Sequence, residues 1–304
     1  MKDRQHHVWR FYLEAWSENK QLWFSQDRGD PRRTNNKNVA VKRHFYKLKP
    51  ITAKDLVQLE GLIKSHSCEI VRNYNLAWLN TFEAVLAFIE SIKSKSDDPD
   101  LHEICDQMLV ETEEDMHSRL EDENIPRIEA LRNKNTDFTC SQDEYFRFLF
   151  FVSLQYLRTK NMQDKFKGRA SHDSSRGMVE SPEAVWSRSR FPMATSVAAS
   201  MFFDDHGYNI KFLVNKSSQE FITCDQPVIN LKNDPGSDLP PEELIIYYPL
   251  SPYLAILITN DFMIKMGDND VVEDSEVDSF NKLMVSHSGS QLFASQKESL
   301  LKYK

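Results

Sequence analysis

Five polar residues lie in or beside apolar segments of this chain and could form a chemical site together. They are His6, Gln155, Arg158, Asp225 and Asn281. In a hydrolytic or nucleolytic site, Asp225 would act as a general base or bind a divalent metal ion, and His6 would be its acid–base partner because the pKa of histidine is near neutrality. Arg158 would stabilise the charge that develops on a phosphate. These three are the predicted catalytic residues, and Gln155 and Asn281 are predicted binding residues.

The same residues also permit a structural interpretation and a ligand-sensing one. A buried guanidinium is costly unless a carboxylate pairs with it, so Arg158 could form an ion pair with Asp225 that ties a helix to a sheet. His6 and Asn281 would then satisfy the remaining hydrogen-bonding groups. A two-metal phosphodiesterase needs several acidic ligands, and the motif offers one carboxylate. The sequence therefore supports such a site poorly and leaves the cofactor open.

The segment around Asp225 predicts a rigid corner between two strands. Residues 221–229 read Phe-Ile-Thr-Cys-Asp-Gln-Pro-Val-Ile, which is two apolar runs meeting at a polar bend. Pro227 fixes its own φ and favours an extended Gln226. Such a corner is a good place to hold a functional carboxylate, and it is also an ordinary way to end a strand.

A basic cluster near the N-terminus supplies further candidates. It consists of Arg32, Arg33, Lys37, Lys42 and Arg43, interleaved with asparagines. This mixture of basic residues and asparagines is typical of phosphate-binding segments, although a solvated loop has the same composition as often. Arg32 and Arg33 are predicted as binding residues on this basis.

Length and composition bound the class of protein. The 304 residues are 40% hydrophobic and 28% charged, which is typical of a soluble globular protein. The apolar runs are far shorter than the ~20 residues that span a bilayer, and no basic-then-apolar leader opens the chain, so we expect a cytoplasmic protein. The four cysteines show no C-x-x-C spacing, which favours reduced thiols over a zinc site.

The charge of the chain is unevenly distributed. The net charge of −8 argues against a nucleic-acid footprint over the whole surface. Residues 97–124 and 204–278 are strongly acidic, whereas residues 1–50 are basic. We interpret the acidic segments as solvated faces, with the basic N-terminus packed against one of them.

The periodicity of apolar residues predicts a helical first part. The first expected elements are a short amphipathic helix at 5–16, a strand at 22–25 and a turn at 27–31. Helices are then expected at 52–95, with a break near His66 or Asn80, and at 98–132, with an interruption at Pro126. A capping box at 141–144 begins a buried central helix, and a loop over 167–190 and a helix at 182–205 follow. The central helix carries Gln155 and Arg158.

Beyond residue 207 the period changes to that of strands. Strands are predicted at 210–214, 221–223, 227–231, 244–248, 253–258 and 291–295, with a helix from Asp274 to His287. The predicted fold is α+β: a largely helical N-terminal two-thirds (1–206, with a short N-terminal strand) packed on a C-terminal antiparallel sheet with one late helix (207–304). We expect residues 1–304 to form a single integrated domain.

Several motifs carry a resemblance to a known family. Residues 5–13 match Q-H-x-V-P-x-x-Y-L except that Trp9 replaces the proline, residues 154–159 match L-Q-x-x-R-T, residues 221–228 match F-x-T-x-D-x-P-V and residues 249–252 match P-L-S-P. A loop ending in Phe45-Tyr46 and the asparagine Asn281 on the last helix are also similar. Together these stretches resemble domain-of-unknown-function family 4238, an uncharacterised, mostly bacterial family.

The resemblance implies a biological role rather than a reaction. Some members of the family look like single-gene anti-phage defence proteins, thought to act by harming the infected cell. Two hypotheses therefore stay open. The chain is an intracellular defence effector that acts as a hydrolase or nuclease on nucleic acid or nucleotide, or it is a non-enzymatic sensor or interaction protein that recognises a phage component.

Overall fold

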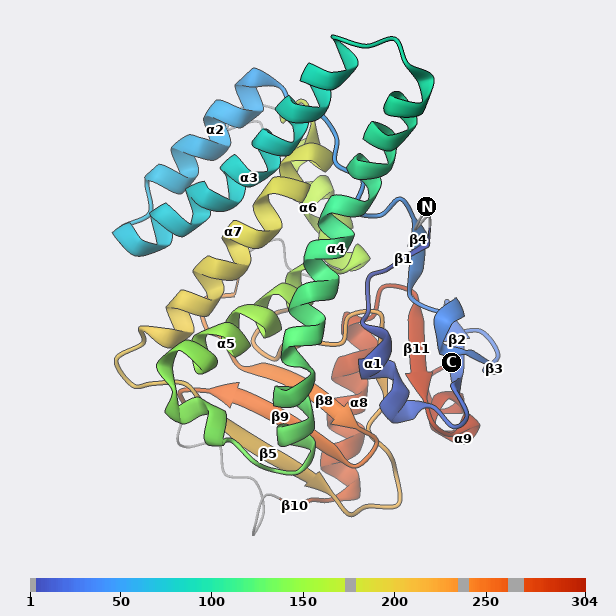
Figure 1. Cartoon of the computed structure of the whole chain (residues 1–304). Helices are drawn as coiled ribbons and strands as arrows, with labels where there is room; N and C mark the ends of the chain where they lie inside the picture. Colours follow the sequence, from blue (N-terminus) through green and yellow to red (C-terminus); the bar gives the residue numbers. More distant parts are fainter. Residues whose placement is uncertain (1–3, 173–178, 235–240, 262–270) are drawn as a thin grey trace.

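A computed structural model describes residues 4–172, 179–234, 241–261 and 271–304. Long helices form the upper body of the molecule, and a sheet crossed by the long helix α4 forms its lower body (Figure 1). A smaller sheet lies to one side and contains strands from both ends of the chain. Within the described residues, no helix is both long and apolar enough to cross a membrane.

The N-terminal segment is less helical than its sequence predicts. Its elements are β1 (Arg4–His6), α1 (Arg10–Leu13), η1 (Glu14–Trp16), β2 (Gln21–Gln26), β3 (Arg32–Asn35), η2 (Asn36–Asn38) and β4 (Val41–Arg43). The predicted helix at 5–16 is wrong at its start, because β1 pairs antiparallel with β4 and holds its backbone extended. The predicted strand at 22–25 is confirmed and lies within β2.

Seven helical segments follow within the described part of residues 53–202. They are α2 (Ala53–Lys64), α3 (Glu69–Lys93), α4 (Pro99–Arg132), η3 (Asp137–Cys140), α5 (Gln142–Leu157), α6 (Lys160–His172) and α7 (Pro182–Phe202). The break predicted near His66 is confirmed, since α2 and α3 are separate helices.

Two predictions about these helices are wrong. Pro126 does not interrupt α4, which continues to Arg132. In the turn before the proline, Asn124 Nδ2 donates to the carbonyl of Leu120 (2.7 Å) and Arg127 Nη1 to that of Glu123 (2.8 Å). The loop predicted over 167–190 is wrong where it overlaps α6 and α7, while residues 179–181 are not helical and residues 173–178 lie outside the described residues. The helix predicted at 182–205 is confirmed by α7.

The predicted central helix is confirmed. Ser141 Oγ accepts a hydrogen bond from the Glu144 backbone N–H (3.4 Å), which begins α5 at the expected capping box. Every residue from Phe148 to Leu157 is buried. Because all sides of this segment are enclosed, α5 anchors the core that α7 and the main sheet share.

The main sheet is covered on both faces. Its order is β10-β5-β9-β8-β7, from β5 (Asn209–Asn215), β7 (Ile229–Asn230), β8 (Ile246–Ser251), β9 (Leu254–Thr259) and β10 (Val271–Val272). Tyr248 and Ile256 face the core around α5, whereas Tyr247 and Leu257 face the core around α8 (Asp274–His287). The predicted antiparallel sheet is confirmed for β5, β7, β8 and β9, but β10 joins β5 in parallel.

The second sheet joins the two ends of the chain. Its order is β3-β2-β11-β6, where β6 is Thr223–Cys224 and β11 is Gln291–Ala294, and α9 (Lys297–Leu301) follows. Phe24 of β2 lies opposite Phe293 of β11 in an antiparallel register. The predicted α+β class is thus confirmed, with N-terminal strands taking part in the C-terminal β layer.

Candidate anion-binding site

The carboxylate of Asp225 is engaged by the loop after α8. Its Oδ1 accepts from the Gly289 N–H (2.8 Å), and its Oδ2 accepts from the N–H groups of Ser290 (2.8 Å) and Gln291 (3.2 Å). Burial raises the pKa of Asp225 above its ordinary value, and these backbone donors oppose that rise. The predicted rigid corner therefore holds the carboxylate against backbone rather than toward a pocket of acidic ligands.

Arg158 does not pair with Asp225, so that predicted ion pair is wrong. Its Nη2 lies 2.6 Å from Glu121 Oε1 on α4. The guanidinium also donates to the backbone carbonyls of His6 (3.3 Å) and His7 (3.5 Å). Glu121 supplies the counter-charge because α4, interpreted from sequence as a solvated acidic face, turns part of its acidic surface into the core.

The end of α5 is joined to the strand corner by the residues that follow Arg158 and Asp225, which are Thr159 and Gln226. Thr159 Oγ1 donates a hydrogen bond to Gln226 Oε1. Gln226 Nε2 donates to the carbonyls of Tyr156 (2.7 Å) and Val228 (3.0 Å). A neutral amide, fully hydrogen-bonded and buried, therefore does what the predicted ion pair would have done.

The remaining predicted residues occupy different places. Asn281 bridges α8 to the segment before β6, accepting from the Ile222 N–H (2.9 Å) and donating to the Glu220 carbonyl (2.9 Å). Gln155 is buried within α5. Burial and the nearby Arg10 lower the pKa of His6 to about 4, so its imidazole is neutral at pH 7. The described contacts link His6 to Arg158 and link neither of them to Asp225.

The predicted basic cluster is divided between two places. Arg33 pairs with Glu18 (2.6 Å) on the surface, and Arg32 lies over the ring of Phe24 (4.9 Å). Lys42 and Arg43 lie instead at the wall of a pocket. The second half of the cluster thus contributes to a concave site.

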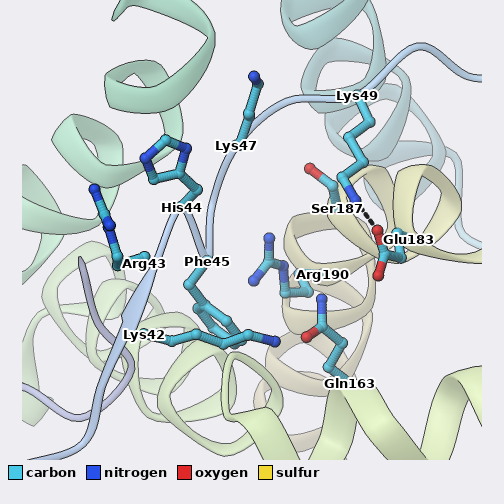
Figure 2. Close-up of a pocket in the computed structure, with 10 residues that line it drawn as sticks. All are labelled: Lys42, Arg43, His44, Phe45, Lys47, Lys49, Gln163, Glu183, Ser187 and Arg190. Carbon is cyan, nitrogen blue, oxygen red and sulfur yellow. Dashed lines mark hydrogen bonds and ion pairs between the residues drawn. The ribbon is translucent and has the colours of Figure 1, made fainter. Parts of the chain in front are cut away.

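That pocket has a volume of about 290 Å³ and lies between the 42–49 segment and α7 (Figure 2). It is lined by Lys42, Arg43, His44, Phe45, Lys47, Lys49, Gln163, Glu183, Ser187 and Arg190. Five of these residues are Lys or Arg and one is Glu, which gives the lining a formal charge of +4 with histidine neutral. The wall therefore favours an anionic ligand.

One face of α7 forms the floor of the pocket. Glu183, Ser187 and Arg190 recur at helical spacing, so they project to the same side (Figure 2). Arg190 is 1% exposed, pairs with the buried Glu113 of α4 and lies over the ring of Tyr46 (5.0 Å). Its Nε and Nη1 have no hydrogen-bond partner among the described residues. The ion pair and the ring hold Arg190 in place, and two of its buried nitrogen donors are left without a partner among the described residues.

Behind Arg190 lies a buried polar network on α4. Glu113 accepts from Ser187 Oγ (2.9 Å), and His117 Nε2 lies 3.4 Å from its other oxygen. Burial raises the pKa of Glu113 while Arg190 opposes that rise, and burial lowers the pKa of His117 well below its ordinary value. Glu113 and His117 thus support the floor of the pocket from its buried side.

Glu113, Gln163 and Arg190 were not among the residues predicted from the sequence. One signal was available: Arg188 and Arg190 stand between two large apolar residues, Trp186 and Phe191, in a segment that is apolar overall. Buried arginines require carboxylates, and Glu113 and Glu121 lie on one face of the acidic helix eight residues apart.

The sequence left the cofactor open, with a divalent metal ion as one option. No three His, Cys, Asp or Glu side chains in these parts of the chain come together in a group that could hold a metal ion. The pocket instead gathers nitrogen donors, which suit an anion.

Comparison with known proteins gives the family and nothing more specific. No curated protein and no solved structure matches the chain. The family model described as protein of unknown function (DUF4238) matches residues 4–298, which is nearly the whole chain, and the protein therefore belongs to that family.

Proposed function

We propose that this protein recognises a phosphate-bearing ligand in the basic pocket between the 42–49 segment and α7. The observation that carries the proposal is Arg190, a buried guanidinium with two unpaired nitrogen atoms at the wall of a cationic cavity. Guanidinium groups are weakly hydrated and hydrogen-bond to phosphate oxygens, so arginine is suited to buried phosphate recognition.

The rim of the pocket supports the same ligand class. Lys47 and Lys49 lie along the 42–49 segment, on the opposite side of the opening from Gln163 (Figure 2). Glu183 pairs with Lys49 and, at 2.7 Å, with Lys167. The pocket thus already holds one anionic group, the Glu183 carboxylate, beside its lysines. A ligand phosphate could replace this carboxylate as the partner of those lysines.

Recognition fits the geometry better than hydrolysis by the predicted catalytic residues. Asp225 accepts hydrogen bonds from loop backbone, and Arg158 is engaged by Glu121. The proposal therefore favours the sensor hypothesis. In the defence role that the family resemblance suggests, the ligand would be a phosphate-bearing compound, a nucleotide or a nucleic-acid end, that reports infection.

Calorimetric titration of the purified protein with pyrophosphate tests the proposal. Lys47→Ala and Lys49→Ala should each weaken binding about three- to tenfold, the effect of one lost charge-assisted contact of ~0.7–1.4 kcal/mol. Lys54→Ala is the matched control, because Lys54 is also exposed and pairs with Glu180 (3.0 Å) but does not line the pocket.

The expected pattern is saturable binding that weakens with added salt and is unchanged by Lys54→Ala. Absence of pyrophosphate binding to the wild-type protein would overturn the proposal. So would equal losses in the two rim variants and the control, because the binding would then reflect general surface charge.

A further inference from the structure

We infer that the ligand carries a hydroxyl donor beside its phosphate, and hence is a sugar phosphate, either free or as part of a nucleotide. The inference rests on the proposed function and concerns the same pocket. Its starting point is Gln163, which is 6% exposed, lines the pocket and has no hydrogen-bond partner for Oε1 among the described residues. A buried carbonyl oxygen without a donor is costly, so this site favours a ligand that supplies one.

Ser187 adds a second acceptor to the floor. Its hydroxyl proton is given to Glu113 Oε2 at 2.9 Å. A hydroxyl has one proton and two lone pairs, so Ser187 Oγ can only accept from a ligand while this bond is kept. The floor therefore combines the donor Arg190 with the acceptors Gln163 and Ser187 (Figure 2).

A simple phosphate does not match this mixture. An ionised phosphate group offers acceptors, which suit Arg190 and Lys42 but oppose the lone pairs of Gln163 Oε1. A sugar phosphate offers both kinds of group within a few bonds, because its hydroxyls donate while its phosphate accepts. The volume of about 290 Å³ is near the lower end of small-ligand pockets and suits a ligand of this size.

Calorimetric titrations with ethyl phosphate, ribose 5-phosphate and AMP test the inference. Ribose 5-phosphate should bind about three- to tenfold more tightly than ethyl phosphate, which corresponds to one added neutral hydrogen bond. Gln163→Met, which removes the amide, should bring that ratio toward one. Gln163→Glu keeps acceptor oxygens and should keep the ratio, even though its charge weakens both phosphates. Gln107→Met, the same change on α4 outside the pocket lining, is the control.

The outcomes separate the inference from the proposed function. Equal affinities for ethyl phosphate and ribose 5-phosphate, or a ratio that survives Gln163→Met in a protein with a wild-type circular dichroism spectrum, would overturn the inference and leave phosphate recognition intact. Equal affinities of Gln163→Glu for ribose 5-phosphate and ethyl phosphate would also overturn the inference, because the amide of Gln163 would then act as a hydrogen-bond donor to the ligand. Failure of all three phosphates to bind while pyrophosphate binds would overturn the inference, and failure of pyrophosphate as well would remove the proposed function itself. AMP binding at least as tight as that of ribose 5-phosphate supports a nucleotide, and much weaker AMP binding supports a free sugar phosphate.

Discussion

Replacing Glu113 by Gln should both destabilise the protein and strengthen its response to an anion. Glu113 is 0% exposed, pairs with Arg190 and accepts a hydrogen bond from Ser187 Oγ. Glu113→Gln leaves the guanidinium of Arg190 buried without its counter-charge, which typically costs ~3–5 kcal/mol. Because native proteins hold only about 5–15 kcal/mol in total, the loss should be plain in urea unfolding followed by circular dichroism.

The second half of this prediction concerns the ligand. An anion that binds only the folded protein at 100 times its Kd stabilises it by about 2.7 kcal/mol. In Glu113→Gln the bound anion becomes the counter-charge of Arg190, so a fixed concentration of pyrophosphate should raise the free energy of unfolding more in the variant than in the wild-type protein. The difference between the two increments measures how strongly Arg190 contacts the ligand.

A matched control separates the effect of the buried ion pair from that of a Glu→Gln change in general. Glu60→Gln makes the same change in an exposed pair with Lys64 (2.6 Å) and should alter stability by no more than ~0.5 kcal/mol. Wild-type stability of Glu113→Gln would refute the reasoning about the buried pair. A destabilised variant with an unchanged pyrophosphate increment would instead show that Arg190 does not face the ligand.

Three further predictions concern the framework around the pocket. Burial and the nearby Arg158 lower the pKa of His7 to about 3, so the imidazole of His7 is protonated in the unfolded chain at a higher pH than in the folded protein. As the pH falls below about 6.5, His7 should therefore lower the free energy of unfolding by up to ~1.4 kcal/mol per pH unit. His7→Phe should reduce this slope in urea titrations between pH 4 and 8. Gln226→Met leaves two buried carbonyls without their donor and should cost about 2–4 kcal/mol in the same assay; an unchanged urea midpoint would contradict the bridging role. Gly289→Ala places a Cβ 3.0 Å from Asp225 Oδ2 and should cost about 1–3 kcal/mol, whereas full stability would show that the loop can move away.

Local patterns predicted the elements whose structure depends on neighbouring residues. The apolar period and capping box of α5, and the short apolar runs of β8 and β9, are properties of short segments, and these elements were confirmed. The loop predicted over 167–190 failed where it overlapped α6 and α7. Its polar residues favour a loop locally, whereas the apolar residues that predicted the helix at 182–205 are confirmed by α7, in which Trp186 and Phe191 are buried.

The partners of buried charges could not be predicted in the same way. Arg158 was expected to need a carboxylate, and it has one, yet the choice between Asp225 and Glu121 depends on how α4 crosses α5. Residues 97–124 contain so many acids that composition does not reveal which of them face inward. The pocket was found only in part for the same reason: Lys42 and Arg43 were noted in the sequence, whereas Arg190 lies far along the chain.

Two motifs of the family contribute to the framework of the pocket, and one of their residues, Phe45, also lines it. Gln5 Nε2 donates to the Val110 carbonyl on α4 (2.7 Å), and Gln5 Oε1 accepts from the Tyr46 N–H (2.7 Å). Tyr46 in turn packs its ring against Arg190 and donates its hydroxyl to the His6 carbonyl (3.2 Å). The Q-H motif, the Phe-Tyr motif and α4 thus meet on one side of the guanidinium. Because these contacts join segments far apart in the chain, the donors of Arg190 are set in place only when the whole N-terminal framework is assembled.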